Sequence, residues 1–243
     1  MHRSPNLLPS FSGMSRCLRF TFCSAFSALA FCADYQIEAN IRYGTSPENV
    51  LDIVQSPAPA LKNRPGVIVI HGAADKSSVM DKFCVPLAQH AFVVANVEYR
   101  TSEPAPISDV IAAAQWFHNH AARFKVDPGQ ILALGEGSGG TLALLLATTP
   151  ASADLGPVTR IVAVINFHGA VSSVTVRRGL PPILTIHGDE DTQSVQLTRS
   201  LKEAGDDAEL ITVPGAKDGF DAAEMAKLWP QIFKWLKKRK IGA

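Results

Sequence analysis

Cysteine is scarce in this sequence, and its placement excludes a disulfide framework. Three of the four cysteines, Cys17, Cys23 and Cys32, lie in or beside an N-terminal apolar segment, so that Cys84 stands alone in the rest of the chain. A single thiol cannot form an internal bridge. Cys84 falls in the apolar stretch 83–91, which has a helical pattern. We therefore interpret it as a small buried hydrophobic residue and not as a nucleophile.

An excess of charge of either sign is also absent. The 243 residues include 23 Lys and Arg and 22 Asp and Glu, which gives a formal net charge of +1. Proteins that bind nucleic acids carry a basic excess, which this composition does not have. We therefore expect no nucleic-acid partner. The basic cluster at 234–240 ends a predicted helix, where cations complement the helix dipole.

The sequence also lacks an uncharged apolar run of roughly 20 residues, the length that a membrane-spanning helix needs. The uncharged stretch 20–33 is shorter, follows Arg16 and Arg19, and ends in small residues suited to cleavage. We predict a signal peptide over 1–33 and a secreted or periplasmic protein after its removal. No stable membrane span is expected in the mature chain, and a retained anchor is the weaker alternative.

The length of the chain predicts one domain over residues 34–243. Folds that mix strands and helices often reach this size around one core. The N-terminal boundary leaves two possible starts, Met1 and Met14, because the residues before Met14 lack the character of a leader.

Unbroken apolar runs indicate strands that are buried on both faces of a parallel sheet. The first of them, 67–70, follows a proline-rich linker. Similar runs occur at 92–97, 131–134, 161–167, 183–187 and 210–213, and two earlier strands are predicted at 35–43 and 50–54. Segments of helical length lie between the runs, at 77–89, 107–124, 141–148, 193–204 and 222–240. This alternation predicts an α/β fold, with a mostly parallel sheet flanked by helices on both faces.

Five short motifs follow the predicted strands, at the sheet edge where ligands bind in open parallel sheets. In chain order they are HGAA at 71–74, EYR at 98–100, GEGSGG at 135–140, HGDED at 187–191 and GAKDGF at 215–220. This ordered set resembles the acetylesterase- and feruloyl-esterase-like branch of the α/β-hydrolase superfamily of esterases and lipases. The resemblance covers the chain after the predicted leader. It implies an α/β-hydrolase fold, here with a minimal cap because 168–182 has no clear helix, and no cofactor.

The resemblance also assigns roles to residues at this edge. Backbone N–H groups of Gly72 or Ala73 are expected to face the oxyanion that develops during ester hydrolysis, together with the N–H that follows the nucleophile. Asp191 matches the acid of the catalytic triad, which orients the histidine and stabilises its protonated form. Patterns typical of metal ligands, such as HxxH, are absent, so no metal is expected.

Two triad positions depart from the family. With Gly135 and Gly139 aligned to GxSxG, the nucleophile position holds Gly137, and the histidine position of GxxHGF holds Asp218. An aspartate, with an ordinary pKa of about 3.9, is a poor general base near neutral pH. A glycine relieves the strained backbone of a nucleophile elbow, so we expect Gly137→Ser to destabilise the fold.

These departures leave three functional hypotheses. The leading one is an esterase-like protein with weak or no catalysis, which binds a small ester or carboxylate. A second is an active carboxylic-ester hydrolase that uses Ser138 in a shifted elbow, with Asp191 and a histidine recruited from His71, His168 or His187. The third is a protein-binding pseudoenzyme that uses its surface.

Overall fold

The structure of the chain is a computed structural model. This structure describes residues 35–57, 62–72, 74, 76–102, 105–150, 159–170, 176–189, 192–216 and 219–242. The predicted leader and the predicted domain boundary at 33/34 lie outside these residues.

A single sheet runs through the described part of the chain, with eight strands in the order β1-β2-β4-β3-β5-β6-β7-β8. Strand β2 pairs antiparallel with β1 and with β4, whereas all pairs from β4 to β8 are parallel. The predicted mostly parallel sheet is therefore confirmed. The strands are β1 (Gln36–Arg42), β2 (Val50–Gln55), β3 (Arg64–Ile70), β4 (Val93–Val97), β5 (Val126–Glu136), β6 (Val164–Phe167), β7 (Ile183–Gly188) and β8 (Ala208–Val213).

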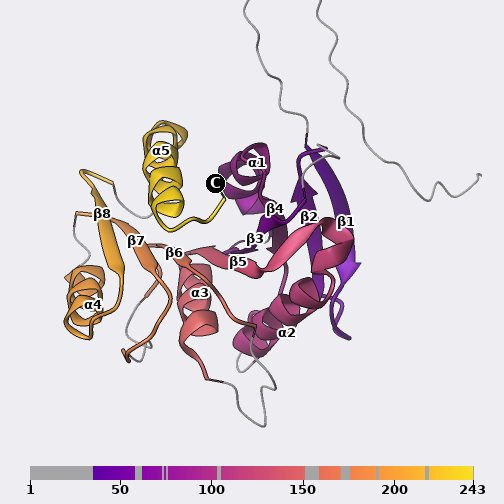
Figure 1. Cartoon of the computed structure of the whole chain (residues 1–243), viewed down its shortest axis with the longest axis horizontal. Helices are drawn as coiled ribbons and strands as arrows, with labels where there is room; N and C mark the ends of the chain where they lie inside the picture. Colours follow the sequence, from indigo (N-terminus) through magenta and orange to yellow (C-terminus); the bar gives the residue numbers. More distant parts are fainter. Residues whose placement is uncertain are drawn as a thin grey trace, which may run out of the picture. The chain divides into compact units, whose positions relative to one another are not determined.

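Helices cover both faces of the sheet, as the sequence predicts. Helices α1 and α5 lie on one side, and α2, α3 and α4 lie on the other (Figure 1). Alternate residues of each strand point to opposite faces, so β3 places Ile68 in one apolar cluster and Val69 in the other. The helices are α1 (Val85–Gln89), α2 (Ala105–Asn119), α3 (Ser138–Thr148), α4 (Thr192–Glu203) and α5 (Ala222–Lys238). None of the described helices is both long and apolar enough to cross a membrane.

The helix predicted over 77–89 is divided into three pieces. A 3₁₀ turn, η1 (Lys76–Val79), leads into a short π-helix, η2 (Met80–Cys84), before α1 begins. Proline is tolerated in the first turn of a helix because its missing N–H has no partner there, and Pro86 occupies that position in α1. Cys84 is fully buried, and burial raises the pKa of its thiol, in agreement with the structural role predicted for it.

Candidate functional site

The turn between β5 and α3 has the sharp geometry of a nucleophile elbow, and Gly137 occupies its tip. Gly137 has φ 57° and ψ −124°, a conformation that residues with a Cβ rarely adopt. Its N–H donates to the carbonyl of Phe167 at 2.9 Å, which ties the turn to β6. A Cβ at position 137 meets only His168 among the described residues, with its Cε1 at 4.0 Å. A side chain at the tip would therefore start next to the His168 ring.

The flanking glycines fix this register by close packing. A Cβ on Gly135 would lie 2.1 Å from the carbonyl oxygen of Gly139, and one on Gly139 would lie 2.2 Å from that of Ile70. Only glycine allows the start of α3 to pack so tightly against β5 and β3. The structure thus places Gly137 at the tip and Ser138 in the first turn of α3.

Ser138 is exposed, and the partner of its hydroxyl is not a histidine. Its side chain interacts with that of Tyr99, whose own hydroxyl donates to the carbonyl of His71 at 2.8 Å. Because Tyr99 has one hydroxyl proton and gives it to His71, its phenol has no proton left to donate to Ser138. Burial raises the pKa of Tyr99, which keeps the phenol neutral. A neutral phenol is too weak a base to activate a serine.

The residue that faces the empty tip, His168, belongs to a chain of three polar side chains. His168 Nε2 lies 3.3 Å from Glu136 Oε1, and the same carboxylate accepts a hydrogen bond from Lys82 Nζ. The three side chains are only 19 to 22% exposed. Lys82 also lies over the rings of Phe83 and Phe220. The cluster is therefore a partly buried ion pair that His168 joins through Glu136.

The charge state of Glu136 follows from its surroundings. Burial by itself raises the pKa of this carboxyl, but hydrogen bonds from His168 and Lys82 outweigh burial and hold the pKa below the ordinary glutamate value of 4.5. The group is thus a carboxylate at neutral pH and accepts hydrogen bonds only. In a neutral His168 ring, Nε2 must then carry the hydrogen, which leaves the lone pair on Nδ1.

We expect this cluster to give the protein an acid-sensitive contribution to stability. Since the folded-state pKa of Glu136 is depressed, its contribution is present above about pH 4.5 and is lost as the pH falls through the folded-state value. Glu136→Gln should therefore lose less stability than the wild type between about pH 6 and pH 3, measured by urea denaturation. Equal losses of stability in the wild type and in Glu136→Gln would contradict the depressed pKa assigned to Glu136.

The other two candidate histidines bond elsewhere. His71 Nε2 lies 3.2 Å from Glu98 Oε1, and its ring stacks on Tyr99 with centroids 4.5 Å apart. His187 is 1% exposed, and its Nε2 lies 3.4 Å from Thr212 Oγ1. Of the three histidines at this edge, only His168 faces position 137.

The oxyanion position is described in part. A Cβ on Gly72 would lie 2.8 Å from the carbonyl oxygen of Glu136 and 3.9 Å from the backbone nitrogen of Ser138. The N–H of Ser138 opens α3, where the first N–H groups lack helical partners and point outwards. The loop at Gly72 therefore borders this N–H, for which no backbone acceptor is found among the described residues. Three predicted site residues, Ala73, Asp191 and Asp218, lie outside the described residues.

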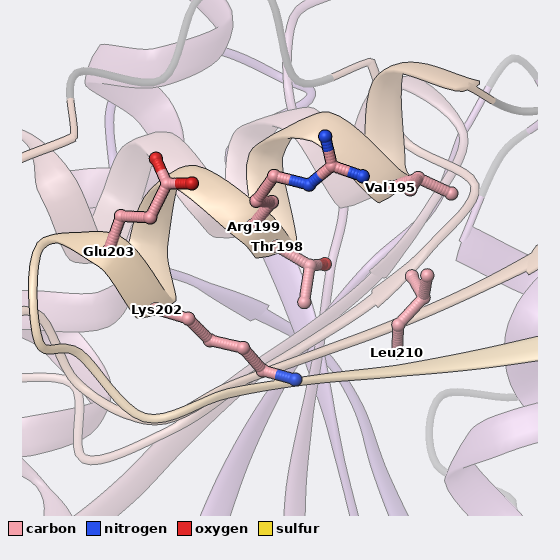
Figure 2. Close-up of a pocket in the computed structure, with 6 residues that line it drawn as sticks. All are labelled: Val195, Thr198, Arg199, Lys202, Glu203 and Leu210. Carbon is pink, nitrogen blue, oxygen red and sulfur yellow. The ribbon is translucent and has the colours of Figure 1, made fainter.

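One groove of the described residues lies apart from the elbow. A groove of about 450 Å³ runs between α4 and β8 (Figure 2). Its lining consists of Val195, Thr198, Arg199, Lys202, Glu203 and Leu210, none of which belongs to the five motifs.

Across the described residues there is no group of three or more His, Cys, Asp or Glu side chains arranged to hold a metal ion.

Sequence reasoning located Gly137 and His168 but missed the roles of Lys82 and Tyr99. Lys82 reaches Glu136 across 54 positions of the chain, from the π-helix before α1. No local motif marks such a contact. Tyr99 lies in the EYR motif, and its position directly after a predicted strand could have indicated a place at the site.

Comparisons with known proteins show the family of the chain. The model of the BD-FAE family matches residues 51–177, just over half of the chain. Neutral cholesterol ester hydrolase 1 of Mus musculus is 36% identical over 103 residues, which are 37% of this chain and 25% of that protein. The probable carboxylic ester hydrolase LipM of Mycobacterium tuberculosis is 28% identical over 168 residues, 62% of this chain and 38% of the relative. The chain thus matches between a quarter and two-fifths of the length of these relatives.

Solved structures show the same fold. A truncated carbohydrate esterase from gut microbiota superposes with a TM-score of 0.70 at 23% identity, covering 84% of this chain and 98% of that one. Esterase 2 of Thermogutta terrifontis gives a TM-score of 0.70 at 21% identity, covering 83% of this chain and 94% of the esterase. The predicted α/β-hydrolase fold is therefore confirmed. The chain belongs to the BD-FAE family, in the esterase branch of the α/β-hydrolases.

Proposed function

We propose that this protein is an exported member of the family that binds a small ester or carboxylate and forms no acyl-serine intermediate. The observation that carries the proposal is Gly137, which occupies the tip of the elbow with φ 57° and offers no nucleophile. The export part of the proposal rests on the apolar segment 20–33 and on Arg16 and Arg19 before it.

Ser138 does not replace the missing nucleophile in this proposal. Nucleophilic catalysis by serine needs an adjacent general base, and the partner of Ser138 is the neutral hydroxyl of Tyr99. The backbone N–H of Ser138 has a role in this proposal, because an N–H group at the start of a helix attracts an anion or a carbonyl oxygen. Together with the loop at Gly72, it supports binding of a carbonyl or carboxylate group. Names of the relatives, which are ester hydrolases, favour the same class of ligand.

Labelling with a fluorophosphonate, followed by mass mapping, tests the absence of an acyl-serine. This reagent modifies activated serines, so we expect no labelled serine in the wild-type protein and no difference for Ser138→Ala. Covalent labelling of the wild type at Ser138 would instead support an active hydrolase with a shifted elbow.

Binding is tested on the same preparation by titration with acetate and butyrate, followed by calorimetry. We expect saturable binding of acetate and butyrate. Gly72→Ala should weaken this binding, because the added Cβ displaces the loop from Glu136. A folded protein with no saturable binding would favour a protein-binding role on this fold.

A further inference from the structure

The glycine at the tip of the elbow leaves the position of a side chain open next to a histidine. A serine side chain at position 137 would fill that space, and the described atom nearest to its Cβ is Cε1 of His168, at 4.0 Å. With glycine there, a water molecule can occupy the position that a hydroxyl oxygen would take. Both an elbow hydroxyl and such a water are oxygen nucleophiles that need a base to remove a proton.

The backbone of His168 has an unfavourable conformation, which the surrounding residues hold in place. It has φ 38°, in the left-handed region that residues other than glycine seldom adopt, and its N–H donates to the carbonyl of Ile186 at 2.8 Å. Its ring also packs against Phe220, with centroids 5.7 Å apart. Strain of this kind persists where the surrounding structure imposes it, and it concentrates at functional sites.

Glu136 gives His168 the orientation that a general base requires. The carboxylate lies 3.3 Å from Nε2 and fixes the hydrogen there, as the acid of a triad does for its histidine. Nδ1, the other neighbour of Cε1 in the ring, then holds the lone pair. Lys82 balances the charge of Glu136, so the cluster does not require a protonated histidine for neutrality.

We infer that His168, oriented by Glu136, is the general base for direct attack of water on an ester bound at the elbow. The inference rests on the proposed function, which supplies the bound ester. Water oxygen bonds to the carbonyl carbon while its proton passes to Nδ1, and the negative carbonyl oxygen faces the N–H of Ser138. The bond to the alkoxy oxygen then breaks, and this oxygen takes the proton back from His168. A carboxylic acid and an alcohol leave, with no covalent bond to the protein.

Hydrolysis of p-nitrophenyl acetate by the full chain tests this mechanism. We expect turnover above the buffer rate that is unchanged by prior fluorophosphonate treatment. His168→Asn should lower kcat/KM by about 100-fold or more, the usual contribution of a general base. Asparagine tolerates the left-handed conformation, so the backbone is kept. The matched control is His118→Asn, on the exposed end of α2, which should leave turnover unchanged.

Glu136→Gln provides a second variant that leaves His168 and its backbone intact. It should lower kcat with little change in KM, because a positioning residue acts on the base and not on the ester. Wild-type turnover equal to buffer, or full activity in a folded His168→Asn, would overturn the inference. If acetate still binds and no serine is labelled, the proposed function survives that result. A fluorophosphonate-labelled serine, by contrast, would overturn the proposed function itself.

Discussion

Gly139→Ala is expected to destabilise the protein by about 4 kcal/mol or more, at the upper end of single-residue effects. The new Cβ would lie 2.2 Å from the carbonyl oxygen of Ile70 and 2.3 Å from that of His71. Both atoms belong to the backbone at the end of β3, so no side-chain rotation relieves the clash, and α3 must move away from the sheet. Urea denaturation measures the loss, and it should appear as a lower midpoint of unfolding.

Gly137→Ala is the matched control, because the same methyl group is added two residues away. Here the nearest described atom lies at 4.0 Å, so the cost comes from the backbone angles alone, φ 57° and ψ −124°. A residue held in such a region costs about 1–3 kcal/mol. The ratio of the two losses separates clash from strain, and a larger loss at 137 than at 139 would refute this account of the turn. A gain in stability at 137 would also contradict the strain expected there from the sequence.

The centre of the sheet was predictable because strands such as β3 and β4 are buried along their whole length. Apolar, β-branched runs such as 67–70 mark strands wherever helices cover both sides, and the glycine turn at 135–140 follows one of them directly. Strand ends were less predictable. β5 begins at Val126, ahead of the predicted 131–134, because Val126 pairs with Arg64 across an irregularity in the β3–β5 register. Pairing between strands extends a segment whose own sequence carries a weak signal.

The side-chain chemistry of the site was predictable only in part, since it depends on long-range contacts. The order of the five motifs indicated which residues follow the strands, and Gly137 was found in this way. The interaction between Ser138 and Tyr99 joins the ends of two different strands, and the pair of Lys82 and Glu136 joins a π-helix to β5. A linear pattern does not record which strand-end residues turn towards each other, because that depends on φ angles such as the 38° of His168.

The two departures from the family motif have different consequences in the folded chain. Glycine at position 137 removes the nucleophile and keeps the elbow, because the flanking glycines and the hydrogen bond to Phe167 fix the turn without any side chain at its tip. In the proposed function, Asp218 at the histidine position of the motif leaves that position without the usual base, and His168, which follows β6, lies beside the tip. In the mechanism proposed above, a hydroxyl at position 137 is then the group that covalent chemistry lacks.

Gly137→Ser should therefore convert the elbow into a reactive serine site. The Cβ of such a serine would lie 4.0 Å from His168 Cε1, the ring carbon between the two nitrogens, so the hydroxyl would lie next to the imidazole. The histidine, oriented by Glu136, then removes the hydroxyl proton, and the N–H of Ser138 faces the oxyanion. We expect fluorophosphonate to label position 137 at least about 100-fold faster than any serine of the wild type, the contribution typical of a general base.

The double variant Gly137→Ser/His168→Asn isolates the contribution of the histidine to this labelling. It keeps the hydroxyl at the tip and a residue that tolerates the left-handed angle at 168, so it should fold like the single variant and label at the slow background rate. Mass mapping locates the adduct, and thermal melting checks that both variants are folded. Equal labelling of the single and double variants would show that His168 does not activate the hydroxyl, and it would remove the structural basis for a base at this edge.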